Sequence, residues 1–142
     1  MYDTILVPVD GSDSMAPIVE DAATLAAERD ATVHLLYVVD KRAFLTLADD
    51  RRDEVIEELE AQGSAALEVA SATMKDHEVA VETHLHHGDP ADEILDLATE
   101  LEVDLIAMGT HARFEDNILG SVSRTVVVEA DVPVLATPLT EP

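Results

Sequence analysis

The sequence predicts an α/β fold: a doubly wound, five-stranded parallel sheet with strand order 3-2-1-4-5 and helices on both faces. Short β-branched runs alternate with longer segments of helical period along all 142 residues. Each connection is long enough for a right-handed crossover between parallel strands. This length and the absence of a linker indicate a single domain spanning residues 1–142.

Five short apolar runs are the expected strands. In chain order they are residues 4–9, 32–39, 79–86, 105–108 and 132–137. The first and fourth are apolar at nearly every position, which is typical of central strands covered on both faces. In the third, Glu82, His84 and His86 alternate with apolar residues, which indicates an edge strand with one wet face. The fifth contains Pro133, which cannot donate to a sheet ladder and therefore also indicates an edge.

The four connecting segments carry apolar residues at spacings of three and four, as amphipathic helices do. The first stripe consists of Ile18, Ala22, Leu25 and Ala26. A second, longer stripe extends from residue 56 to residue 74. Pro90 stands where a first-turn proline belongs and begins the third helix. A fourth helix is expected from about Gly120 to Glu129.

The charge balance excludes several classes of partner. Thirty-one acidic residues against 8 basic ones give a net charge of −23, which repels phosphate backbones and anionic lipids. Neither nucleic acid nor a membrane is therefore an expected partner. The chain has no cysteine, so disulfides, thiolate metal sites and a cysteine nucleophile are excluded. No run approaches the roughly 20 apolar residues of a membrane span, and the first residues lack a signal peptide's basic region, so we expect a cytoplasmic protein.

The acidic residues are spread over every expected helix rather than gathered in a tail. Their mutual repulsion weakens a compact state in ordinary salt, but at molar salt the Debye length falls to about 3 Å and the repulsion is screened. The composition resembles that of proteins from salt-in halophilic archaea. An acidic protein from an ordinary habitat is the alternative, and stability measured against KCl concentration separates the two.

The strand order places a topological switch point between the first and fourth strands, where ligands bind beyond the strands' carboxyl ends. In the first of the two loops that meet there, Pro8-Val9-Asp10-Gly11-Ser12-Asp13, Asp10 or Ser12 either contacts a ligand or only caps the next helix. The second loop leads from Gly109 to Gly120-Ser121-Val122-Ser123. The helix N-terminus and hydroxyls of that segment suit a phosphate, while plain N-capping is the alternative.

Motifs spread over nearly the whole chain resemble the universal stress proteins of the A type. The matching segments are residues 5–12, 36–40, 88–90, 106–111, 119–123 and 130–135. The resemblance implies a Rossmann-like fold, similar to that of the adenine nucleotide alpha hydrolases, with ATP, either alone or with Mg²⁺, at the switch point. In the site that the resemblance implies, Asp10 and Val38 contact the adenosine, Gly109 approaches the ribose, and residues 120–123 hold phosphate oxygens. The complete expected site is Pro8, Val9, Asp10, Val38, Met108, Gly109, His111, Ala112, Arg113, Gly120, Ser121, Val122 and Ser123.

The sequence departs from the family's ATP-binding pattern, a glycine, two residues, a glycine, nine residues, then glycine followed by serine or threonine. Ala112 replaces the second glycine, and the loop after it is two residues short. An alanine forced into a left-handed conformation costs about 1–2 kcal/mol. Glu115 and Asp116 also repel a triphosphate unless a divalent ion or Arg113 offsets them.

These observations lead to a non-catalytic, ATP-binding stress-response module that signals to an unidentified protein partner. The chain contains no P-loop motif, nucleophile elbow or dinucleotide fingerprint. The resemblance also implies a homodimer that pairs through residues 132–137, and a loop covering that edge is the alternative. A scaffold that binds no nucleotide and a slow ATPase are the competing functions.

Histidines occur at two places where they could have a chemical role. His84, His86 and His87 could ligate zinc or copper, but a wet edge-strand face explains them equally well and is favoured. His111 lies in the second loop, and an acid–base role for it is not favoured.

Overall fold

The computed structural model describes residues 3–110 and 121–138, and it confirms the predicted sheet. All strands are parallel and lie in the predicted order β3-β2-β1-β4-β5. They are β1 (Thr4–Pro8), β2 (Thr32–Asp40), β3 (Ala80–Gly88), β4 (Leu105–Thr110) and β5 (Val134–Pro138). The two expected edge strands, β3 and β5, are at the edges.

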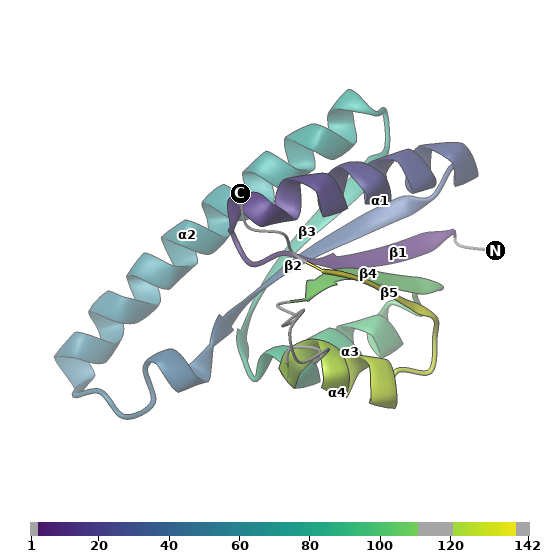
Figure 1. Ribbon diagram of the computed structural model, residues 1–142. Coiled ribbons are helices and arrows are strands. Elements are labelled where there is room, and N and C mark those ends of the chain that lie inside the picture. The colour runs from purple at the N-terminus through teal and green to yellow at the C-terminus, as the bar shows by residue number, and fades with distance from the viewer. Residues whose placement is uncertain (1–2, 111–120, 139–142) are drawn as a thin grey trace.

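Helices cover both faces of the sheet, as Figure 1 shows. They are α1 (Ala16–Arg29), α2 (Asp49–Asp76), α3 (Pro90–Glu100) and α4 (Ser121–Glu129), with short 3-10 turns η1 (Asp13–Met15) and η2 (Lys41–Ala43). Because side chains alternate along a strand, Ile5 and Val7 face α1 and α2, whereas Leu6 faces α3 and α4. All three are fully buried, so β1 forms the centre of both cores.

The strand ends differ from the predicted ones at positions that shape the site. β2 and β4 each extend further than expected, to Asp40 and Thr110. The fifth strand begins at Val134 rather than Val132. Pro133 has no N–H to donate, and its carbonyl instead accepts a hydrogen bond from the Ile106 N–H at 3.0 Å.

The wet face expected on β3 is only partly present. Glu82 is exposed, but His84 and His86 are half-buried, so the expectation is wrong for these two residues. His34 of β2 is buried on the same face, and its Nδ1 lies 3.0 Å from Nε2 of His84. His34 of β2 thus gives His84 a polar partner inside the sheet, and this face of β3 is less exposed than expected.

Among residues 3–110 and 121–138, no helix combines the length and apolar composition that crossing a bilayer requires.

Candidate functional site

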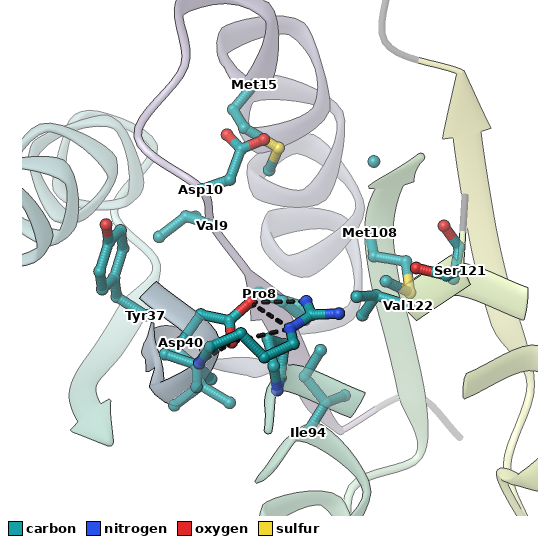
Figure 2. A pocket seen from close by; sticks show the side chains of 16 residues that line it. Pro8, Val9, Asp10, Met15, Tyr37, Asp40, Ile94, Met108, Ser121 and Val122 are labelled. Atoms are coloured by element: carbon teal, nitrogen blue, oxygen red, sulfur yellow. Dashed lines mark hydrogen bonds and ion pairs between the residues drawn. The ribbon is translucent and has the colours of Figure 1, made fainter. Parts of the chain in front are cut away.

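A cavity of about 370 Å³ opens at the carboxyl ends of the central strands (Figure 2). β1 lies between β2 and β4 in the sheet, and the helices that follow β1 and β4, α1 and α4, pack on opposite faces of it. The cavity is therefore at the predicted switch point. Nine of the predicted site residues line it: Pro8, Val9, Asp10, Val38, Met108, Gly109, Ser121, Val122 and Ser123. Its volume falls in the range of about 300–1,000 Å³ that is usual for small-molecule sites.

The loop after β1 holds Asp10 in a local turn at the cavity wall. Oδ1 of Asp10 accepts hydrogen bonds from the backbone N–H of Ser12 at 2.9 Å and from its hydroxyl at 2.8 Å. Gly11 has φ +82°, in the left-handed region that favours glycine. Asp10 thus shapes the turn and also lines the cavity, while α1 begins several residues later, with Met15 at its N-cap. Neither Asp10 nor Ser12 is the cap of that helix.

On the other side of β1, the end of β4 and the first turn of α4 form the opposite wall. Met108 is buried and Gly109 half-buried at the end of the strand. Ser121 begins α4 and is exposed, whereas Ser123 is buried. The first N–H groups of a helix have no partner inside it and carry partial positive charge, so this wall presents hydrogen-bond donors to the cavity.

The other four predicted site residues, His111, Ala112, Arg113 and Gly120, lie outside the described residues. Glu115 and Asp116, which were expected to repel a triphosphate, lie outside them as well.

Seven further residues line the cavity without having been predicted. They are Met15, Leu36, Tyr37, Asp40, Arg42, Pro90 and Ile94. Leu36, Tyr37 and Asp40 fall in a matched family segment, residues 36–40, and the alternation of β2 places Leu36 and Asp40 on the same face as Val38. The alternation of side chains along β2 was therefore the signal that could have predicted Leu36 and Asp40. No sequence signal indicated Arg42, because this residue reaches the cavity only through the η2 turn.

Among the described residues that line the cavity, Asp40, Arg42 and Tyr37 have perturbed pKa values. Hydrogen bonds from Arg42 lower the pKa of the Asp40 carboxyl, which stays ionised. Burial raises the pKa of Tyr37, and the nearby Asp10 carboxylate raises it further. At neutral pH the cavity therefore holds the neutral phenol of Tyr37 and the ionised carboxylate of Asp40.

Each of the β3 histidines has a protein partner in the structure. His86 Nδ1 lies 3.1 Å from Glu93 Oε1, and His87 Nε2 lies 2.9 Å from Glu60 Oε2. In the described part of the chain, no three histidine, cysteine or acidic side chains are arranged to hold a metal ion.

Comparisons with known proteins agree with this geometry. The model of the universal stress protein family matches residues 1–138. The universal stress protein MJ0531 of Methanocaldococcus jannaschii is 36% identical over 95% of this chain and 81% of its own. The structure of MJ0577, a universal stress protein of the same organism, superposes with a TM-score of 0.89 at 26% identity, covering 100% of this chain and 99% of that one. A universal stress protein from Archaeoglobus fulgidus in complex with dAMP superposes with a TM-score of 0.67 at 27% identity, covering 95% of this chain and 97% of that one.

Proposed function

This chain belongs to the universal stress protein family, and from that membership we propose that its switch-point cavity binds an adenine nucleotide, ATP. The observation that carries the proposal is the convergence of the β1 loop, the end of β4 and the first turn of α4 on one cavity. The dAMP bound by the Archaeoglobus fulgidus relative supports the same ligand class.

The two sides of the cavity suit the two ends of a nucleotide. Val38 and Ile94 provide apolar surface for a base. Across β1, the N-terminal turn of α4 offers backbone N–H groups and the Ser121 and Ser123 hydroxyls to phosphate oxygens. Asp10, which follows β1, and Gly109, at the end of β4, also line the cavity, and in this proposal they contact the adenosine and the ribose.

The nucleotide is bound rather than turned over in this proposal. Among the described residues, two carboxylates line the cavity, and both already accept hydrogen bonds from the protein, Asp10 from Ser12 and Asp40 from Arg42. These hydrogen bonds favour a structural role for both carboxylates in the cavity wall over the role of a general base. The protein then acts through nucleotide-dependent contacts with a protein partner. Steady phosphate release that is abolished by Asp10→Ala would contradict this part of the proposal.

Titration calorimetry of ATP with Mg²⁺ tests the binding, in about 1 M KCl so that the net charge of the chain is screened. We expect saturable binding that the double variant Ser121→Ala, Ser123→Ala weakens by about tenfold or more, because it removes two hydroxyl donors. Thr125→Ala is the matched control, since it removes a hydroxyl from the next turn of α4. Its own hydroxyl donates to the Ser121 carbonyl at 3.1 Å.

A chain that shows no heat, no thermal shift and no nucleotide retained on purification would contradict the proposal. Ala112 and the shortened loop would then decide the function in favour of a scaffold that binds no nucleotide.

We also propose that the chain forms a homodimer through residues 132–137, which include most of the edge strand β5. Leu135 of that strand is 50% exposed, and Val127 and Val128 on the neighbouring α4 are 43% and 75% exposed. An edge strand with apolar neighbours favours pairing with a second copy.

A further inference from the structure

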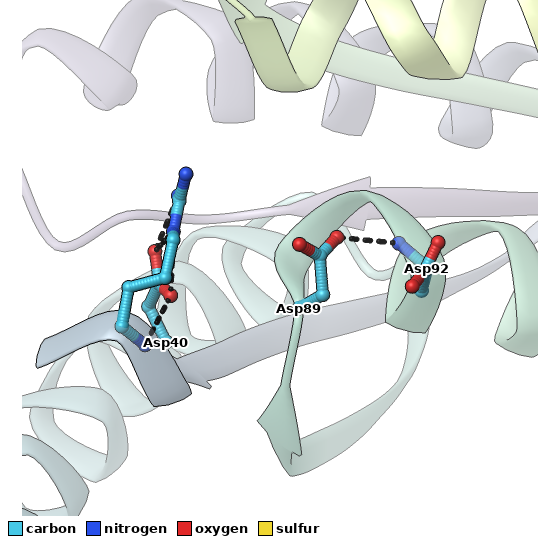
Figure 3. Close-up of polar contacts among 4 residues, drawn as sticks. Asp40, Asp89 and Asp92 are labelled. Atoms are coloured by element: carbon cyan, nitrogen blue, oxygen red, sulfur yellow. Dashed lines mark hydrogen bonds and ion pairs between the residues drawn. The ribbon is translucent and has the colours of Figure 1, made fainter. Parts of the chain in front are cut away.

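The end of β2 forms one tightly bonded charge pair at the mouth of the cavity, shown in Figure 3. Oδ1 of Asp40 accepts the Arg42 backbone N–H at 2.9 Å, and Nε of Arg42 donates to both oxygens at 3.0 Å. Nη2 of Arg42 donates to Oδ2 at 2.6 Å. A single carboxylate therefore fixes both the backbone and the side chain of Arg42.

The guanidinium bonds to Asp40 along one edge, through Nε and Nη2, and 59% of the Arg42 side chain is exposed. A guanidinium is planar, and its N–H donors all lie in that plane. Bonding along the Nε and Nη2 edge holds the plane in one orientation beside the carboxylate. The positive charge is offset by Asp40, so the pair as a whole is a weak attractor for phosphate. Asp89 adds a second acidic group nearby, although its own Oδ1 accepts the Asp92 N–H (Figure 3).

The pair belongs to the part of the cavity that suits a base. Asp40 and Arg42 follow β2, which lies on one side of β1, whereas the serines of α4 follow β4 on the other side. In Figure 2 the hydrogen-bonded Asp40 is drawn among the cavity-lining side chains, with Pro8 and Ile94 near it in this view. Arg42 is the one lysine or arginine among the described residues that line the cavity.

We infer that Arg42 is a base-binding residue that stacks its guanidinium on the nucleobase, with Asp40 as the residue that positions it. This inference rests on the proposed nucleotide site and names the feature that the site recognises, an aromatic base rather than a polyphosphate. Guanidinium groups stack favourably on aromatic rings, and recognition of unstacked bases uses this contact repeatedly. A base entering the cavity meets apolar surface from Pro8 and Ile94 together with this flat, fixed cation.

Binding of two ligands that differ only in phosphate tests the inference. Calorimetry with ATP and with adenosine is compared for the parent chain, Arg42→Ala and Arg42→Lys in about 1 M KCl. We expect Arg42→Ala to raise both dissociation constants by the same factor, about five- to thirtyfold. Arg42→Lys keeps the charge but lacks the plane, and we expect it to restore little of the affinity.

Lys41→Ala is the matched control, because Lys41 is an exposed cation in the same 3-10 turn that does not line the cavity. It removes the same unit of charge and should leave both constants within about twofold. Circular dichroism and thermal unfolding verify that each variant folds. Arg42 is exposed, and the Asp40 cap of the turn needs only its backbone.

Several outcomes would overturn the inference. A loss for ATP without a loss for adenosine would place Arg42 on the phosphates, and rescue by Arg42→Lys would show that charge alone matters. Unchanged affinities in Arg42→Ala, beside a parent chain that binds, would overturn this inference and leave the proposed function standing. A parent chain that binds neither ligand would overturn both.

Discussion

Gly63 sets how closely α2 approaches the sheet. A Cβ at this position would lie 2.8 Å from Cε1 of Tyr37 and would also collide with Cδ1 of the same ring. Glycine inside a helix is unfavourable by roughly 0.5–1 kcal/mol relative to alanine, so intrinsic helix preference alone argues against it here. Its presence follows from the aromatic ring that packs on the backbone of α2.

We therefore expect Gly63→Ala to destabilise the protein by about 1–3 kcal/mol, because the ring and the helix must move apart. Urea unfolding in about 1 M KCl measures this change. Ser64→Ala is the control, since Ser64 is exposed on the same helix and its replacement should be neutral or slightly stabilising. A Gly63→Ala variant as stable as the parent would show that the contact with Tyr37 does not determine the position of α2.

At the scale of elements, β2 and β3 are joined by a histidine pair as well as by their ladder. Nδ1 of buried His34 lies 3.0 Å from Nε2 of His84, so one of the two rings donates and the other accepts. Burial lowers the pKa of His84, and the neighbouring His34 and His86 lower it further, while Glu82 and Glu100 oppose the shift. Glu93 of α3 is a further acidic group beside these histidines, because its Oε1 lies 3.1 Å from Nδ1 of His86.

The lowered pKa fixes the sign of an acid effect. The folded state disfavours a proton on His84, whereas the unfolded chain takes one up near the ordinary value of 6.5. The contribution to stability is therefore present above pH 6.5 and lost as the pH falls below it. We expect the free energy of unfolding to decrease from pH 7.5 to about pH 5.5, and the decrease to be smaller in His84→Gln.

His77→Gln serves as the comparison for this pH effect. His77, the C-cap residue of α2, pairs with Glu20 of α1, and its Nε2 lies 2.9 Å from Oε2 of the glutamate. The decrease in stability at acidic pH should persist in this variant. Identical pH profiles for the parent chain and His84→Gln would contradict the assignment.

The strands were predictable because burial on both faces is written directly in their composition. β1 and β4 are nearly continuous apolar runs, and Pro133 marks the edge next to β5. The histidine pair was not predictable, because His34 sits in an apolar run and its partner is 50 residues away. Local patterns carry periodicity and turn chemistry, but they do not carry the register that brings His34 and His84 together.

The candidate site, like the sheet, was predictable only in part. The loops after β1 and β4 follow from the switch-point rule and Val38 of β2 follows from the family resemblance, and the structure brings the nine described residues together at one cavity. Their role in binding stays a prediction. Arg42 was missed because Asp40-Lys41-Arg42 offers two adjacent cations, and only the 3-10 turn selects which one reaches the cavity.

At the scale of the whole molecule, the charge of −23 opposes compaction. We expect the free energy of unfolding to rise steeply between about 0.1 and 2 M KCl, because the Debye length shortens from about 10 Å to below 3 Å over that range. NaCl at equal ionic strength should act similarly if screening is the cause. Equal stability at both ends of the range would contradict the interpretation of the acidic surface as an adaptation to salt.

The proposed dimer predicts that a charge introduced at one exposed apolar position abolishes dimerisation, whereas the same charge at another position has no effect. Leu135 on the edge strand β5 is 50% exposed, and Val69 on α2, outside the proposed interface, is 71% exposed. We expect the parent chain to have the mass of a dimer by light scattering in about 1 M KCl, where long-range repulsion between copies is screened. Leu135→Glu should convert it to a monomer, because pairing would bury an uncompensated carboxylate. Val69→Glu adds the same charge and should leave the dimer intact. A monomeric parent chain, or a dimer that survives Leu135→Glu, would show that the exposed edge of β5 is not where two copies meet.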